Sequence, residues 1–207
     1  MAEKRSYRLD LSALRESRDY RFILSAGAIS GFGSMVTAVA MPLQIAQLTG
    51  SYVAVGLIGL IEVVPLIIFG LWGGAIADSF NRKRVVIASE IGLGICSLLL
   101  LLNARQAQPS LLLIYIVAFF FSVFDGLQRP SLESLLPLLL PTRLLPSAGA
   151  INSLKWNLTS IAGPAVGGII AATVGVVYCY GFDVASYALS ALLLARLSTR
   201  ADTHERK

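Results

Sequence analysis

Six apolar stretches, separated by short polar connections, constrain the fold of this chain more than any other feature of its sequence. A helix needs about 20 mainly apolar residues to cross a bilayer, and the stretches at about 22–47, 53–77, 85–103, 110–135, 148–173 and 176–196 each approach or exceed that length. Apolar residues make up 56% of the chain and charged residues only 14%, which leaves too little polar surface to cover a soluble globule. The sequence therefore predicts an all-α integral membrane protein with six transmembrane helices.

The distribution of lysine and arginine predicts how these helices are oriented. Cationic residues gather before the first stretch, after the second, after the fourth and in the tail: Lys4, Arg5, Arg8, Arg15, Arg18, Arg21, Arg82, Lys83, Arg84, Arg143, Arg200, Arg206 and Lys207. The first and last connections carry none, and the third carries only Arg105. Because cytoplasmic loops are enriched in lysine and arginine, both termini are predicted to be cytoplasmic. We expect a cytoplasmic segment over 1–21, a helical bundle over 22–197 and a cytoplasmic tail over 198–207.

A weak internal repeat relates the two halves of the bundle. The first and fourth stretches each hold a proline beside polar residues, at Pro42 and Pro130. The second and fifth each hold a glycine cluster: Gly70, Gly73 and Gly74 in one, Gly163, Gly167 and Gly168 in the other. A three-plus-three inverted repeat, from which transporter halves are built, predicts this pairing. Coincidence is the alternative, because proline and glycine are common in transmembrane helices.

Ionisable residues inside the apolar stretches are candidates for function, because a charge in a bilayer is costly. Glu62 is the only charged residue of the second stretch, and either it carries protons or binds cations in a central cavity, or it pairs with a neighbouring helix. Asp125 and Arg129 are four residues apart on one helix, so they are predicted to pair, with a gate or a substrate contact as the alternative. Gln44 completes the predicted cavity set of Glu62, Gln44, Asp125 and Arg129.

Three further charged residues receive weaker interpretations. Glu90 follows Arg84 by less than two helical turns, so we expect it to reach back toward the basic loop. Lys155 lies early in the fifth stretch, and Asp183 is expected to be an interfacial or structural residue near the start of the sixth.

The loop between the second and third stretches resembles the loop signature of the major facilitator superfamily of secondary transporters. The matching residues are Gly74, Asp78, Arg82, Lys83 and Arg84. The usual cation after the aspartate is Ser79 here, and the usual loop glycine is Asn81. The resemblance implies that these residues form a cytoplasmic latch, in which Asp78 pairs with the cations and with a facing half of the transporter.

The fifth stretch resembles a glycine-rich element carried there by exporters of the same superfamily. Its residues are Gly163, Pro164, Gly167 and Gly168, whereas the further upstream glycine of that pattern is replaced by Thr159. Shorter matches, such as Pro42 to Ile45 and Ala148 to Ile151, extend the resemblance over about residues 9–197 toward the siderophore and drug exporters. The resemblance thus favours export over uptake.

Together these features predict a secondary active exporter, with proton-coupled antiport of a siderophore or an amphipathic drug-like molecule, in a bacterial cytoplasmic membrane. Members of the superfamily have twelve spans, so the chain is expected to be an N-terminal half that pairs with a second six-helix half or with itself. The resemblance implies that the glycine faces of the second and fifth stretches meet that second half. The alternative is a non-transporting assembly or regulatory partner.

No cofactor or metal is expected, because His204 is the only histidine and Cys96 and Cys179 lie apart in apolar stretches. An enzyme is disfavoured because the sequence shows no nucleophile–base pair and no metal cluster. A nucleic-acid partner is disfavoured because the cationic residues gather between apolar stretches and form no patch of the size of a groove.

Overall fold

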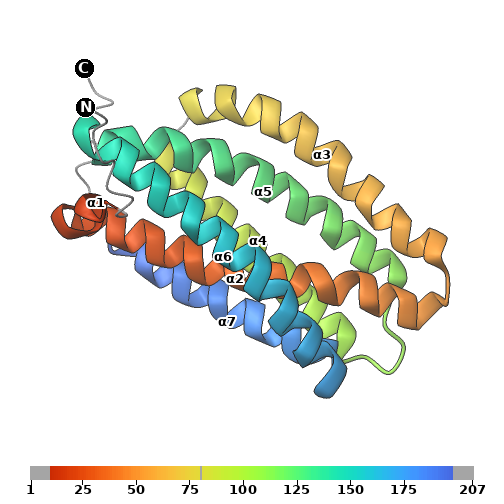
Figure 1. Ribbon diagram of the computed structural model, residues 1–207. Coiled ribbons are helices and arrows are strands. Elements are labelled where there is room, and N and C mark those ends of the chain that lie inside the picture. The colour runs from red at the N-terminus through yellow and green to blue at the C-terminus, as the bar shows by residue number, and fades with distance from the viewer. Residues whose placement is uncertain (1–9, 80, 198–207) are drawn as a thin grey trace, which may run out of the picture.

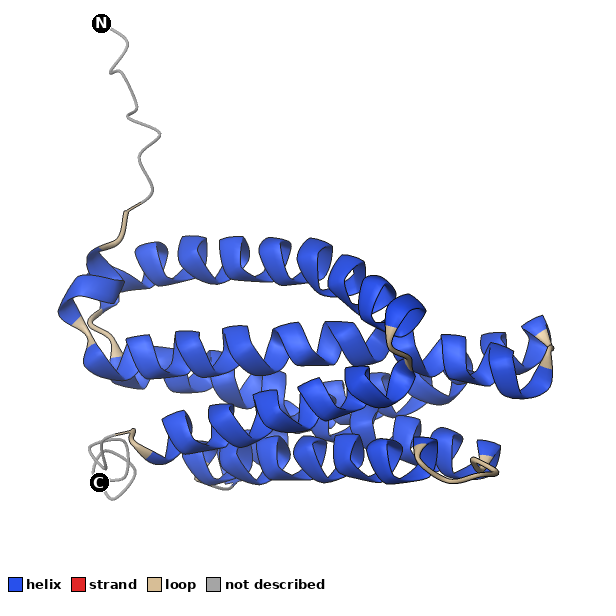
Figure 2. Ribbon diagram, turned by 90° about the horizontal axis from the view of Figure 1, so that it is seen from below, coloured by secondary structure: helices blue, strands red, loops and turns tan. Residues whose placement is uncertain are grey.

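The computed structural model describes residues 10–79 and 81–197, with the side chains of 73–79 outside the description. Within these ranges the chain is a bundle of long helices that run roughly alongside one another (Figures 1 and 2), and it contains no strand. The helices are α1 (Ser12–Glu16), α2 (Arg18–Thr49), α3 (Tyr52–Ser79), α4 (Arg82–Ala104), α5 (Leu111–Leu139), the 3-10 helix η1 (Thr142–Leu144), α6 (Leu145–Thr173) and α7 (Val176–Ala195).

Each of the six predicted apolar stretches coincides with one long helix, α2 to α7. Five of these have both the length and the hydropathy needed to cross a membrane: α2, α3 as far as Trp72, α4, α5 and α7. The helix α6 has 29 residues and is long enough, but its polar side chains and glycines make it less apolar than these five helices, so it does not meet the hydropathy criterion. The described helices therefore establish an all-α, multi-pass membrane architecture.

Local sequence explains where several of the helices begin and end. The side chains of Ser17, Asn81 and Ser110 accept hydrogen bonds from the backbone N–H groups three residues later and so cap the N-termini of α2, α4 and α5. Gly50 ends α2 in the left-handed region, at a φ of 61°, where a residue without a Cβ atom is favoured. Prolines lie inside four helices, at Pro42, Pro65, Pro130, Pro137 and Pro164.

Helix packing follows a paired arrangement. The helix α2 makes its most extensive contacts with α7 and α6, α5 makes its most extensive contacts with α3 and α4, and α4 packs against α7 to join the two groups. Figure 1 shows α3 at the edge of the bundle, beside α5. Much of its apolar surface is exposed, including Leu71 at 76%, so this surface faces lipid or another protein.

Glycines allow the closest helix contacts, and their partners differ from the sequence expectation. A Cβ atom on Gly163 would lie 2.4 Å from Met35 Cβ, and one on Gly167 would lie 3.0 Å from the backbone of Val36. These two glycines thus pack on α2 of the same chain, whereas we expected the glycine face of this helix to await a separate half. Gly168 on the neighbouring face would meet no atom within 4 Å.

The residues before α2 are held against the start of α6. Tyr20 donates from its hydroxyl to the Ala148 carbonyl at 2.9 Å, and Ser147 Oγ donates to the Asp10 carbonyl at 2.6 Å while accepting from Ala13 N–H at 3.3 Å. An exposed pair joins Glu16 to Arg143. Several apolar side chains close around these bonds, so this contact, which we call the N-terminal clasp (residues 10–20 with 140–151), is a packed part of the fold.

The Arg143 guanidinium holds the pKa of Glu16 below its ordinary value. A carboxylate whose pKa falls on folding stabilises the folded state above its unfolded pKa. The contribution of the Glu16 pair is therefore present at neutral pH and is lost as the pH falls through the lowered value.

We expect Gly167→Ala to destabilise the bundle and Gly168→Ala to leave it nearly unchanged. The added methyl at 167 meets the Val36 backbone, which cannot rotate away, and overpacking of this kind costs about 1–3 kcal/mol. The thermal unfolding temperatures of the two variants in the same detergent provide the measurement. Equal unfolding temperatures would contradict the packing of α6 on α2.

We expect Ser147→Ala to release the N-terminal clasp, because Ser147 bonds both Asp10 and Ala13. Amide hydrogen exchange at Ala13 is expected to accelerate. The matched control is Ser153→Ala on the same helix, since Ser153 donates only to the Gly149 carbonyl of its own helix. Unchanged exchange at Ala13 in the Ser147 variant would show that packing alone holds the segment.

Candidate functional site

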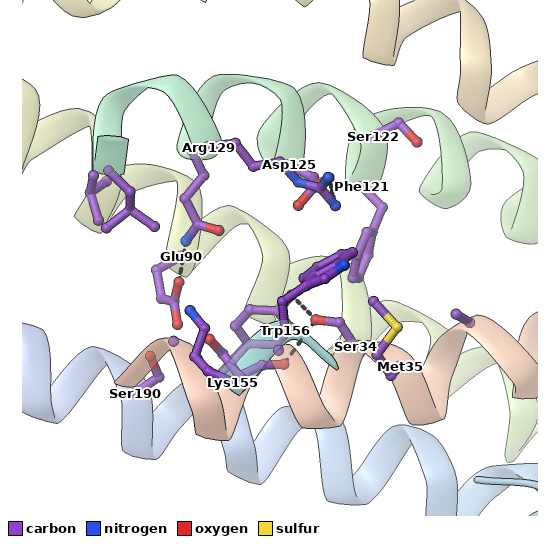
Figure 3. A pocket seen from close by; sticks show the side chains of 18 of the residues that line it. Ser34, Met35, Glu90, Phe121, Ser122, Asp125, Arg129, Lys155, Trp156 and Ser190 are labelled. Carbon is purple, nitrogen blue, oxygen red and sulfur yellow. Dashed lines mark hydrogen bonds and ion pairs between the residues drawn. The ribbon is translucent and has the colours of Figure 1, made fainter. Parts of the chain in front are cut away.

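A cavity of about 580 Å³ lies between the helices of the bundle, and its wall receives residues from α2, α3, α4, α5, α6 and α7. This volume lies within the range that small-molecule sites usually have. The wall mixes apolar side chains with ionisable ones, and the charged residues on it are Glu62, Glu90, Asp125, Arg129, Glu133 and Lys155. Figure 3 shows the side chains that line part of this space.

The α5 side of the cavity carries the ion pair expected from the sequence. Arg129 Nη2 lies 2.9 Å from Asp125 Oδ2, and both side chains retain contact with the open space of the cavity. The Arg129 guanidinium also lies over the ring of Trp156 on α6, 5.2 Å from its centroid. Such a contact is a cation–π interaction. The pair therefore links α5 to α6 across the cavity and presents a charged and an aromatic surface together.

Glu62 enters the same cavity from α3. Its side chain is partly buried, and it is close enough to Asp125 for the two carboxylates to repel each other. The structure thus brings together three of the four residues that the sequence assigned to the cavity.

The fourth, Gln44, lies elsewhere. It is 3% exposed and does not line the cavity, and its Oε1 atom accepts a hydrogen bond from the Tyr180 hydroxyl at 2.7 Å. Both partners sit beside the buried apolar residues Met41 and Ile45, so this bond joins α2 to α7 inside the core. A glutamine in an apolar stretch has to satisfy its amide within the protein, and a neighbouring tyrosine does so here.

Glu90 contradicts its sequence interpretation. It does not reach back to the basic loop but is 2% exposed, lines the cavity, and accepts a hydrogen bond from Gln128 Nε2 on α5. The missed signal was helical periodicity: Val86, Glu90, Leu93 and Ser97 recur at intervals of three or four residues on the buried face of α4.

Asp183 is a structural centre rather than an interfacial residue. It is 0% exposed, and its Oδ2 atom accepts from Thr37 Oγ1 on α2 at 2.7 Å and from Ser97 Oγ on α4 at 2.6 Å. Ser186 Oγ donates mainly to the Asp183 backbone carbonyl within α7, at 2.7 Å, and lies 3.3 Å from Oδ1. These bonds join three helices behind the cavity wall.

Two cations of the basic segment, at the start of α4, bond to backbone carbonyls of other parts of the chain. Arg82 Nη1 donates to the Ser134 carbonyl of α5 at 3.1 Å, and Lys83 Nζ donates to the Leu197 carbonyl at 3.1 Å. Arg84 is exposed. The side-chain surroundings of Asp78 and of Gly74 lie outside the described part of the structure.

The glycine-rich element of α6 serves the packing already described, with Gly163 and Gly167 on α2 and Gly168 open. Pro164 lies inside the helix between them. Among the described residues no group of three or more histidine, cysteine, aspartate and glutamate side chains is arranged to hold a metal ion.

The sequence profile of a family described as "Transmembrane secretion effector" matches residues 10–207. Among curated proteins, the chain is similar to the enterobactin exporter EntS of Escherichia coli O1:K1, of strain E24377A and of strain HS, with 34% identity over 194 residues in each case. The match covers 94% of this chain and 47% of each relative, so the chain spans about half the length of the curated relatives it matches.

These relatives are transporters rather than enzymes, and the matched region covers nearly all of the helices that enclose the cavity. The helices identify a multi-pass inner-membrane protein. The chain accordingly belongs to the transmembrane secretion effector family of major facilitator superfamily transporters and corresponds to an N-terminal half.

Proposed function

We propose that the chain is the N-terminal half of a proton-coupled antiporter that exports a siderophore or an amphipathic drug-like molecule. The observation that carries this proposal is the cavity, where apolar and aromatic surface lies beside six charged side chains from four helices. Because charges are costly inside a membrane, their gathering around one space argues for a transport site. The similarity to enterobactin exporters supports the direction of transport and the siderophore class.

Six crossings arranged as a three-plus-three inverted repeat are the architecture that we infer, with α6 as the remaining crossing. The packing supports it. If α2 corresponds to α5, α3 to α6 and α4 to α7, then the contacts of α2 with α6 and α7 correspond to the contacts of α5 with α3 and α4. Inverted repeats of this kind move against each other around a site near the middle of the membrane. In this arrangement both termini, with residues 1–21 and 198–207, are cytoplasmic.

A second six-helix half completes the transporter in this proposal, supplied either by another chain or by a second copy. The chain covers 47% of its relatives, and α3 exposes apolar side chains along much of its length. The loop residues Gly74, Asp78, Arg82, Lys83 and Arg84 then act as a cytoplasmic latch against that half. The bonds of Arg82 and Lys83 to backbone carbonyls support the latch role, since they fix the loop to α5 and to the residues after α7.

Within the cavity we assign Glu62 to ion coupling and the Asp125–Arg129 pair to substrate contact or gating. Glu62 is partly accessible from the cavity and faces a second carboxylate, an arrangement that favours exchange of a proton or a cation. Arg129 presents a guanidinium and, through Trp156, an aromatic ring to the same space. An amphipathic substrate needs both kinds of contact.

We expect Glu62→Gln to abolish the dependence of export on a pH gradient while substrate binding is retained. Glutamine preserves the size of the side chain but removes the titratable charge. Proton flux and substrate flux, measured in vesicles that contain the chain and its second half, test this. Glu133→Gln, which removes an exposed carboxylate of the same cavity, is the control. Full gradient dependence in the Glu62 variant would exclude it as the coupling residue. A lack of substrate-dependent proton flux in every preparation, the unaltered chain included, would favour a non-transporting partner.

We expect a cysteine at Leu71 on α3 to crosslink to a second half, whereas a cysteine at Leu192 on α7 does not. Both positions are exposed, at 76% and 64%, but only α3 lies at the edge that we assign to the interface. The background carries Cys96→Ser and Cys179→Ser, since these are the native thiols. Equal crosslinking at both positions, or at neither, would contradict an interface at α3.

A further inference from the structure

Five helices, α4 among them, meet around the carboxylate of Glu90 in the wall of the cavity. Gln128 of α5 bonds to its Oε2 atom, and Lys155 of α6, Ser190 of α7 and Ser30 of α2 surround the rest of the carboxyl group. Figure 3 shows the Glu90 side chain pointing toward Lys155 and Ser190. The long helices that supply this cluster are all those of the bundle except α3.

Two atoms of the cluster lack hydrogen bonds. Glu90 Oε1 and Ser190 Oγ are both buried and have no hydrogen-bond partner within the described residues. Buried polar atoms are almost always paired, so each such exception points to an unassigned water, ion or proton. Both atoms belong to residues that line the cavity, which gives the site a route to its occupant.

We propose that Glu90 reversibly binds one proton at Oε1 and shares it with the hydroxyl oxygen of Ser190. In the acid form, the new O–H of Glu90 donates to Ser190 Oγ. In the carboxylate form, the Ser190 hydroxyl turns and donates to Oε1. A hydroxyl is both donor and acceptor, so the same two atoms are satisfied in either state. The proton is taken from cavity water and is returned to it, and the charge of the cluster changes by one.

The surrounding charges favour a proton over a metal cation. Lys155 lies on the α6 side and attracts the carboxylate, but its ammonium would repel a cation held at the same place. Ser30 donates its hydroxyl proton to the Ala26 carbonyl of its own helix, so it has no proton left to donate to the Glu90 carboxylate. A sodium or larger ion needs several oxygen ligands, whereas a proton needs only one covalent oxygen and one acceptor.

Other titratable groups also face the cluster. Asp183 and Tyr187 of α7 interact electrostatically with Glu90. Asp125 and Arg129 of α5 form their own pair in the cavity, and Glu62 of α3 lies on the same wall. The residue that faces Glu90 from α2, Ser30, is uncharged. Lys155 is thus the cation that attracts the ionised carboxylate of Glu90. Protonation of Glu90 removes this attraction.

This inference deepens the proposed function by naming a second proton site, more deeply buried than Glu62, and its coupling role rests on that function. Proton binding itself is measurable without transport. Infrared difference spectra between acidic and neutral pH, recorded on the full chain in lipid vesicles, report the C=O stretch of each carboxyl group that gains a proton.

We expect Glu90→Gln to remove one carboxylic acid band from these spectra, whereas Glu133→Gln leaves that band in place. Ser190→Ala is expected to keep the band but move it to higher frequency, because the acid loses its hydrogen-bond acceptor. This second variant decides the question if Glu90→Gln does not fold. Retention of the full band in a folded Glu90→Gln protein, or an unshifted band in Ser190→Ala, would overturn the proposal.

Three further outcomes bear on the proposal, and the last two separate the proton site from the transport function. A band that sodium ions remove at constant pH would overturn the proton assignment in favour of a cation site. A Glu90 band in a chain that exports nothing, even with its second half, would support the proton site and contradict the exporter. Gradient-dependent export with no Glu90 band would support the exporter and contradict the proton site.

Discussion

The buried carboxylate of Asp183 is the interaction on which the arrangement of the bundle depends. It accepts hydrogen bonds from Thr37 of α2 and Ser97 of α4, and because Asp183 itself belongs to α7, these bonds tie the three helices together at one point. A hydrogen bond to a charged group contributes about 1.5–3 kcal/mol in proteins, whereas leaving such a group unpaired in an apolar interior costs more. The three helices are therefore fixed relative to one another by the requirement to satisfy Asp183.

Close backbone approach makes this arrangement possible. A Cβ atom on Gly33 would lie 2.5 Å from Asp183 Oδ1, so α2 reaches the carboxylate only because it carries glycine there. On the other side of α2, Gly163 and Gly167 bring α6 equally close. The helices α5 and α6 then stand opposite each other, with Arg129 and Trp156 in contact across the cavity. Polar groups that would be costly in lipid thus face one internal space, where the proposed substrate and protons meet.

Sequence patterns predicted the six long helices α2 to α7, because helix length and apolar character can be read from a local stretch of sequence. Five of these helices also have the hydropathy of membrane spans. Sequence patterns also predicted the Asp125–Arg129 pair, since spacing along one helix is a local property. They failed for Gln44, Glu90 and the α6 glycines, whose surroundings depend on which faces of separate helices meet. Tyr180, which satisfies Gln44, lies 136 residues away in the chain, and no local pattern connects them. The role of Asp183 was left open for the same reason.

In the proposed exporter, the polar space between the helices is a water-accessible substrate cavity within the membrane. Labelling by a membrane-impermeant maleimide tests it, with Met35→Cys on the cavity wall and Leu192→Cys on the exposed face of α7, in a background without Cys96 and Cys179. The chain is assayed in membranes together with its second half. We expect the thiol introduced by Met35→Cys to be labelled much faster than the one introduced by Leu192→Cys, and an exported substrate to protect it. Labelling of both positions at the same slow rate, with no protection, would contradict a water-accessible substrate cavity.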